Sequence, residues 1–155
     1  MSRISSPASR ARAAIGALPA ALSAVLDAEA VLAAGSLPKQ DVETVKLAVS
    51  AATGCDHCVA AHSLRAKLAG LKPEAIRNIR EGKPTGDAKR DALARFVRLL
   101  VATGGAISDD EFAVIEAAGY SDRQLVEIGI AVALIIFTNT FNRINDTDVD
   151  FPPVS

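Results

Sequence analysis

The sequence predicts an all-α fold, a single-domain bundle of about six to seven helices. Half of its 155 residues are apolar, so the chain can bury a core, yet only 4% are aromatic. Alanine, the strongest helix former, is by far the most frequent residue, which favours closely packed helices over a β-sandwich or barrel. We expect residues 1–15 to be loosely ordered and residues 16–155 to form one all-helical domain.

Glycines and prolines mark the helices in the first half of the chain. A glycine closes each predicted helix, as is typical of helix C-termini. These helices cover residues 20–34, 38–53, 55–70 and 72–82. Pro38 and Pro73 suit a first helical turn, and Ser36 is expected to cap the second helix.

Three further helices are predicted in the second half of the chain. They cover residues 87–103, 108–119 and 121–145. Ser108 and Glu111 have the spacing of a capping box, and Ser121 begins the last helix. Residues 149–155, with two prolines, are expected to form an extended tail. Phe112 is predicted to lie in the core.

The last predicted helix is apolar nearly all round between Ile128 and Phe137. Such a helix is buried on several sides. In a chain of this length, part of the covering surface is expected to come from another subunit, so a homo-oligomer is predicted. The polar residues Asn139, Asn142 and Arg143 follow this stretch and are expected at a subunit interface.

Charge and hydropathy exclude several classes of partner. The net charge is −1, without the basic excess of nucleic-acid-binding proteins. The apolar stretch at residues 128–137 is about half the ~20 residues that span a bilayer. Neither GxGxxG nor a Walker sequence occurs. We therefore expect a cytoplasmic protein with no nucleic-acid or membrane partner, no cofactor and no metal.

The chemistry is predicted to reside in the segment Gly54-Cys-Asp-His-Cys-Val-Ala-Ala-His62. On a helix, Cys55, Cys58 and His62 share one face, whereas His57 points elsewhere. Cys55 lies at the helix N-terminus, where the helix dipole favours a thiolate. His62 follows Cys58 by one turn and can accept or relay its proton, as a base does beside an activated nucleophile. In a reducing compartment, two cysteines at this spacing indicate reactive thiols or a metal site. We expect no metal, because a structural zinc site usually draws further ligands from a second Cys/His pair, which this sequence does not have.

Glu43, on the preceding helix, is the candidate partner of His62. In an antiparallel hairpin about Gly54, the two side chains differ in height by about one helical turn. A long side chain or one water molecule would then join them. The alternative for Glu43 is a solvated ion pair with Lys39 or Lys46, which lie on the same helix face.

The pattern Glu43-x11-Cys55-x2-Cys58-x3-His62 resembles the active site of the alkylhydroperoxidase (AhpD-like) branch of the carboxymuconolactone decarboxylase family. The closing segment, from Asn139 to Pro152, is also similar. This resemblance implies an AhpD-like all-helical fold that assembles as trimers or hexamers. It also implies reduction of a hydroperoxide substrate, with regeneration by an external dithiol.

Residue roles follow from the same resemblance. Cys58 is expected to be the attacking thiol, Cys55 the resolving thiol, Glu43 and His62 the proton relay, and His57 an accessory residue. From the residues alone, the order of attack stays open, because the helix dipole favours Cys55 and proximity to His62 favours Cys58. Two alternative functions also remain: a decarboxylase-like lyase or isomerase acting on a small lactone acid, and a non-enzymatic CxxC redox sensor.

Overall fold

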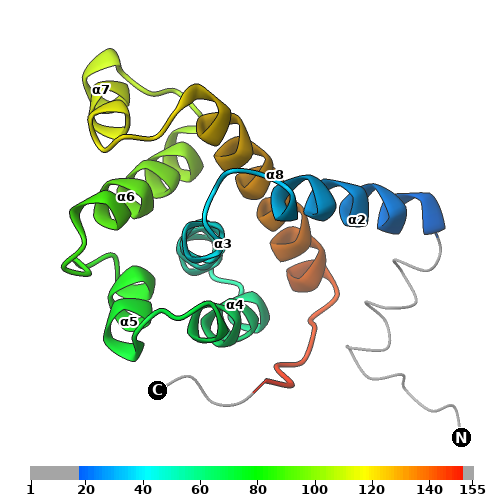
Figure 1. The fold of residues 1–155 in the computed structure, drawn as a ribbon. Coiled ribbons are helices and arrows are strands. Elements are labelled where there is room, and N and C mark those ends of the chain that lie inside the picture. Colours follow the sequence, from blue (N-terminus) through cyan, green and yellow to red (C-terminus); the bar gives the residue numbers. More distant parts are fainter. Residues whose placement is uncertain (1–17, 152–155) are drawn as a thin grey trace, which may run out of the picture.

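The computed structural model describes residues 18–151, which form seven α-helices and no strands (Figure 1). The helices are α2 (Pro19–Ala33), α3 (Lys39–Thr53), α4 (Asp56–Leu68), α5 (Pro73–Glu81), α6 (Ala88–Thr103), α7 (Asp109–Ala117) and α8 (Asp122–Ile144). The all-α prediction is confirmed. The expected loose N-terminus, residues 1–15, and the end of the expected tail, residues 152–155, lie outside the described residues.

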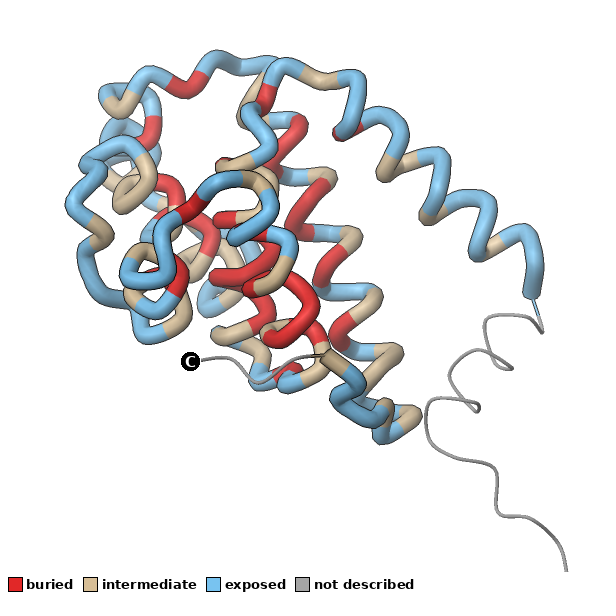
Figure 2. Tube along the Cα trace, turned by 60° about the horizontal axis from the view of Figure 1, so that its bottom comes forward, coloured by how far each residue is buried: buried red, intermediate tan, exposed pale blue. Residues whose placement is uncertain are grey.

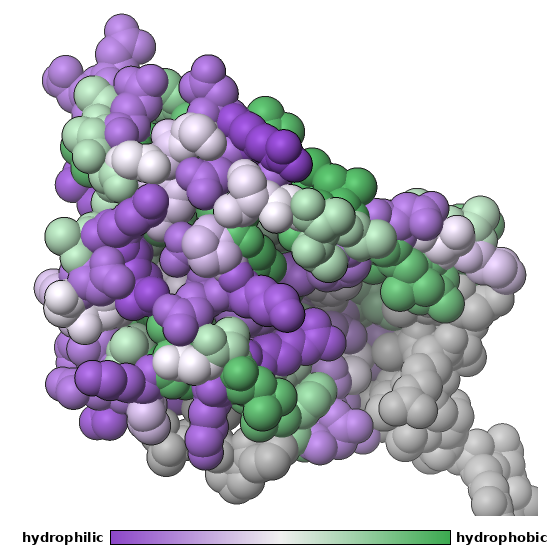
Figure 3. Space-filling view, viewed as in Figure 1, coloured by the Kyte–Doolittle hydropathy of each residue, from purple (hydrophilic) through white to green (hydrophobic). Residues whose placement is uncertain are grey.

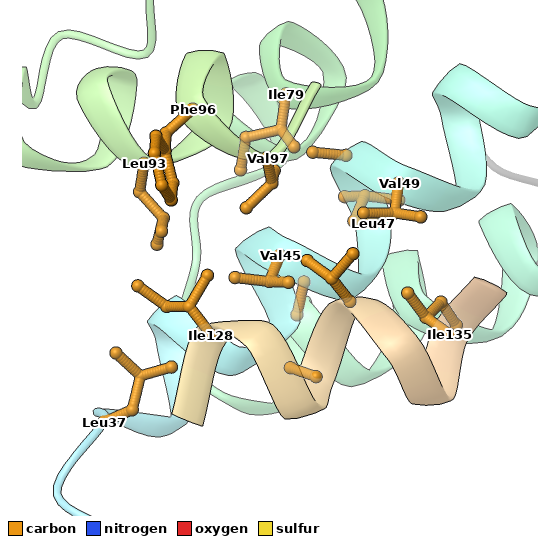
Figure 4. Packing of buried hydrophobic residues seen from close by; sticks show 14 of the residues in the cluster. Leu37, Val45, Leu47, Val49, Ile79, Leu93, Phe96, Val97, Ile128 and Ile135 are labelled. Carbon is orange, nitrogen blue, oxygen red and sulfur yellow. The ribbon is translucent and has the colours of Figure 1, made fainter. Parts of the chain in front are cut away.

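Helix α3 is the centre of the bundle, with α4, α5, α6 and α8 packed around it (Figure 1). Every residue from Thr44 to Ser50 is buried, so the helix is enclosed on all sides. Its Val45, Leu47 and Val49 meet apolar side chains from α5, α6 and α8 in one core (Figure 4). Glu43 lies on α3, and the two cysteines and His62 belong to the adjoining helix α4 and its N-cap. This packing therefore holds the predicted site residues on a rigid support.

Several predicted helix ends have the expected chemistry. Ser108 forms the predicted capping box with Glu111, and Ser121 begins α8 as predicted and also forms a capping box, with Gln124. The prediction for Ser36 is wrong, because Pro38 precedes α3 and no side chain caps that helix. Ser36 instead donates its N–H and its hydroxyl to the carboxylate of Glu127 on α8, 91 residues away.

Two helices lie at the edge of the bundle, and on one of them a core prediction is wrong. Phe112 on α7 is exposed, because α7 packs on α6 at the edge of the bundle. Helix α2 extends from the body as an arm, exposed along most of its length (Figure 2). Only Leu32, near its C-terminal end, is buried.

Helix α8 is the one described helix long and apolar enough to cross a membrane by length and composition. Its inner side, however, carries the buried polar residues Glu127 and Asn139, and both are hydrogen-bonded to other parts of the bundle. These contacts are those of a core helix.

Candidate active site

The hairpin of α3 and α4 positions the predicted residues. Gly54 ends α3 in the left-handed conformation (φ 69°), which glycine adopts without strain. The chain then reverses at once, and Cys55 becomes the N-cap residue of α4. Cys58 therefore lies in the first turn of α4 and His62 one turn further. The expected antiparallel arrangement is present.

The two cysteines form a close pair of free thiols. Their Sγ atoms are 2.7 Å apart, and the residues are 2% and 3% exposed. The side-chain amide of Asn142 on α8 donates to the Cys58 Sγ at 3.2 Å. Two sulfurs this close share a proton and need little movement to form a disulfide bond.

Sharing a proton moves the pKa values of the two thiols apart. The Cys58 thiol, as donor to the Cys55 sulfur, lowers the pKa of Cys55 to about 7, against the opposing effect of burial. The same hydrogen bond, reinforced by burial, raises the pKa of Cys58. When the pair loses one proton, the negative charge therefore lies on Cys55, at the N-terminus of α4.

We expect alkylation of Cys55 by iodoacetamide to rise with pH around a midpoint near 7, below the ordinary thiol value of 9.0. Because the bond from Cys58 is the largest cause, Cys58→Ala should move this midpoint upward. The measurement is the rate of mass addition at Cys55 between pH 5 and pH 10. An unchanged midpoint in the variant would show that Cys58 does not set this pKa.

Glu43 and His62 form the second half of the site. The Glu43 Oε2 and His62 Nδ1 atoms are 2.8 Å apart, so the contact is direct and needs no water. Lys46, the competing ion-pair partner, is bonded instead to Glu29 on α2 at 2.6 Å. With Nδ1–H donating to the carboxylate, Nε2 remains to accept or release a proton.

His57 does not join these pairs. Its Nδ1 atom is 2.7 Å from the backbone carbonyl of Asp148, and its ring lies against Phe151 at 5.1 Å between centroids. Through these two contacts, His57 holds the segment that follows α8 against the start of α4. Its accessory role in the chemistry stays a prediction.

Three polar residues of α8 connect this helix to the site, and they do so within one chain. Asn139 is buried and donates to the Thr53 hydroxyl, while Arg143 donates to the Thr53 carbonyl. Asn142, which donates to Cys58, lies between them in sequence, so the three residues occupy positions i, i+3 and i+4 of one helix. The interface prediction is therefore wrong for the buried Asn139. In the sequence, these contacts are indicated by polar residues at helical spacing that follow the apolar stretch of the last helix.

Two pockets open beside the site. One, of about 390 Å³, borders Glu43 between α2, α3 and α4. The other, of about 420 Å³, lies at the thiol end of the hairpin and is lined by Thr53 and by Asn139, Thr140, Arg143 and Ile144 of α8. Among residues 18–151, no three His, Cys, Asp or Glu side chains are arranged to hold a metal ion. The arrangement combines a thiol pair with a buried acid–base pair.

Comparison with known proteins identifies the family of the chain and supports its fold. The family model of the carboxymuconolactone decarboxylase family matches residues 16–98, more than half of the chain. The chain belongs to this family. The chain is similar, at 28% sequence identity, to a protein of known crystal structure from Agrobacterium tumefaciens. That protein is described as one of unknown function and as a suggested AhpD antioxidant defence protein. The match has a TM-score of 0.71 and covers 91% of this chain and 96% of the other. A comparison with curated proteins gave no match.

Proposed function

We propose that this protein is a thiol-dependent peroxidase or disulfide oxidoreductase that reduces hydroperoxides through Cys58 and Cys55. The observation that supports this most is the buried thiol pair, with 2.7 Å between its sulfurs. The Glu43–His62 pair, one turn along α4, provides the base that such chemistry needs.

In the first step a thiolate attacks the distal oxygen of the hydroperoxide. The proton shared by the two sulfurs moves to Cys55, and the Cys58 thiolate is stabilised by the amide of Asn142. An S–O bond forms and the O–O bond breaks. Cys58 is oxidised to a sulfenic acid, and the leaving alkoxide takes a proton that His62 relays from solvent and becomes an alcohol.

In the second step the Cys55 thiol attacks the Cys58 sulfenic acid. A disulfide bond forms and the hydroxyl group leaves as water, with the proton lost by Cys55. An external dithiol then reduces the disulfide by exchange and is itself oxidised to a disulfide. This cycle requires a reducing compartment such as the cytoplasm.

The direct test is a titration of the reduced protein with cumene hydroperoxide and with hydrogen peroxide at neutral pH. We expect both free thiols to disappear and mass spectrometry to find a Cys55–Cys58 disulfide that dithiothreitol reverses. Catalytic turnover with excess dithiothreitol separates an enzyme from a redox sensor, since a sensor forms the disulfide without turnover. Survival of both thiols in excess oxidant would reject the proposal.

The relay is tested by Glu43→Gln. The amide still accepts a hydrogen bond from His62, but it cannot stabilise the positive charge of the ring during proton transfer. Peroxide turnover should fall about 10²-fold, the lower end of what general acid–base catalysis contributes. Glu29→Gln is the matched control, because Glu29 lines the same pocket and bonds Lys46 rather than His62. Equal losses of peroxide turnover in the two variants would contradict the relay and attribute the loss to the negative charge of the pocket.

One observation favours a second candidate, a lyase or isomerase on a small lactone acid. Glu43 and His62 form an acid–base pair in a member of the carboxymuconolactone decarboxylase family, and this pair does not include the thiols. Retention of lactone conversion in Cys58→Ser, with peroxide reduction absent from the unsubstituted protein, would establish that activity instead.

A further inference from the structure

Helix α8 ends in a turn that brings Thr147 back onto Asn142. Asp146 adopts the left-handed conformation (φ 48°), and its N–H donates to the Arg143 carbonyl at 3.3 Å. The Thr147 N–H donates to the Asn142 carbonyl at 3.0 Å. These two bonds define a Schellman motif, in which the residues at the Thr147 and Asn142 positions lie side by side. The end of α8 therefore fixes the place of Thr147.

The side chains at these two positions form a polar pair. In a Schellman motif they usually make an apolar contact. Here the Thr147 hydroxyl donates to the Asn142 Oδ1 at 3.2 Å. Hydrophilic side chains cover most of the face of the molecule in Figure 3, whereas these two are half-buried and bonded to each other. A polar pair in place of the usual apolar contact indicates that the Asn142 amide has a task besides ending the helix.

The Asn142 amide can face Cys58 in two ways. Its last torsion angle has two broad positions, which present either the NH2 group or the carbonyl oxygen to the sulfur. The NH2 group donates to a Cys58 thiolate and stabilises it, whereas the oxygen, an acceptor, would repel it. Because the Thr147 hydroxyl is bonded to Oδ1, Nδ2 is left to donate to the Cys58 Sγ, at 3.2 Å.

The chain around Thr147 is held at a second point. We call residues 145–151 the strap, which continues from α8 and passes below α4 in Figure 1. The His57 Nδ1 lies 2.7 Å from the Asp148 carbonyl, and the His57 ring packs edge-on against Phe151. Thr147 is therefore anchored from both directions, by the end of α8 and by His57 at the start of α4.

We propose that Thr147 is a positioning residue for Cys58, because its hydroxyl holds the Asn142 amide with the NH2 group facing the sulfur. This inference rests on the proposed function, in which the Cys58 thiolate attacks the hydroperoxide. The bond from Cys55 and burial raise the pKa of Cys58, and the Asn142 amide lowers it. Loss of the Thr147 hydroxyl should therefore raise the pKa of Cys58.

Cys55→Ser provides a protein in which Cys58 is the only cysteine and titrates alone. The measurement is the rate of mass addition by iodoacetamide at Cys58 as a function of pH. Thr147→Val, added to this background, removes the hydroxyl and keeps the shape. The midpoint should then move upward by about one pH unit, the size expected for one hydrogen bond to a charged group. Thr147→Ser keeps the hydroxyl and should keep the midpoint of the background.

Asn142→Leu, in the same background, shows whether Thr147 acts through the amide. It removes the donor to Cys58 and should raise the midpoint at least as far as Thr147→Val. The two substitutions together should raise it no further than Asn142→Leu alone, because no amide is left for the hydroxyl to hold. Thermal melting checks that each variant is folded.

The charged and titratable groups that the structure places around the thiol pair are the same in all these variants. They are Asp56, His57 and His62 on α4, Glu43 on α3, Arg143 on α8, and Asp148 and Asp150 on the strap. A difference in midpoint between two variants therefore reports on the hydrogen bond to Cys58 and not on a change of charge.

Three results would overturn the proposal. They are an unchanged midpoint in Thr147→Val, a Thr147→Ser midpoint that moves as far as that of Thr147→Val, and a double variant whose shift exceeds that of Asn142→Leu. Alkylation needs no peroxide, so this test is separate from that of the proposed function. A protein that forms no disulfide with cumene hydroperoxide and still shows the expected midpoints would reject the proposed function and support the positioning of the amide by Thr147.

Discussion

Cys58→Ser should abolish turnover of cumene hydroperoxide in the presence of dithiothreitol. A serine hydroxyl is not ionised at neutral pH and does not displace an alkoxide from a peroxide, so the proposed attacking group is lost. The variant should stay folded, because serine fills nearly the same buried volume beside Asn142. The measurement is steady-state peroxide consumption, with thermal melting as the check on folding.

Two companion variants make this result specific. Ser63→Ala is the control, because Ser63 is buried on the same helix and its hydroxyl has no hydrogen-bond partner within the described chain. Without dithiothreitol, Cys55→Ser should be oxidised only as far as a sulfenic acid at Cys58, which dimedone traps, instead of forming the disulfide. Trapping at Cys55 in Cys58→Ser instead would reverse the two roles, in line with the lowered pKa of Cys55.

Glu127→Ala should destabilise the fold strongly. The Glu127 carboxylate, 5% exposed, accepts from the Leu37 N–H at 2.6 Å, and from the N–H of Ser36 at 2.9 Å and its hydroxyl at 3.1 Å. It thereby fastens the loop between α2 and α3 to α8. Removing it leaves the buried Leu37 N–H unpaired and takes a charged acceptor away from the two Ser36 donors, at a cost of about 3 kcal/mol. For a chain of this size the melting temperature should fall by about 10 °C.

Gly35→Ala tests the same contact from the other side. A methyl group at Gly35 would lie 2.8 Å from the Glu127 carboxylate, so the loop or the carboxylate must move. The control is Gly129→Ala, whose methyl group meets open space in the interior of α8 and should raise the melting temperature slightly, because Ala favours a helix over Gly. Equal melting of the Gly35 and Gly129 variants would contradict a close fit around Glu127.

The stabilisation by Glu127 should depend on pH. Hydrogen bonds, first of all from the Ser36 N–H, lower the pKa of Glu127 below its ordinary value of 4.5. A carboxyl group whose pKa is lower in the folded state stabilises fully above its unfolded value, and the effect disappears as pH falls through the folded pKa. The difference in melting temperature between the unsubstituted protein and Glu127→Gln should be constant above about pH 5 and should narrow below 4.5. A constant difference down to pH 3 would contradict the lowered pKa.

Local patterns in the sequence predict the helices and the reactive hairpin. Glycines, prolines and two capping boxes mark helix ends because capping acts within a few residues. The 3.6-residue period of a helix likewise acts over a few residues, so it places Cys55, Cys58 and His62 on one face. The partner of Glu43 is harder to predict, because Lys39 and Lys46 lie on the same helix face and offer competing ion pairs. Its partner is decided by packing, which pairs Lys46 with Glu29 and leaves Glu43 to His62.

By itself the sequence determines that this protein is helical and that it carries a CxxC pair beside a histidine. Only the tertiary structure decides which distant groups meet. Asn142 contacts Cys58, Asn139 and Arg143 contact Thr53, and Glu127 contacts the loop where Ser36 was expected to cap a helix. These partners are 84 to 91 residues apart. Helix periodicity and capping act over a few residues, whereas such contacts depend on how α8 packs against α3. The same packing leaves the arm of α2 and the outer face of α8 uncovered.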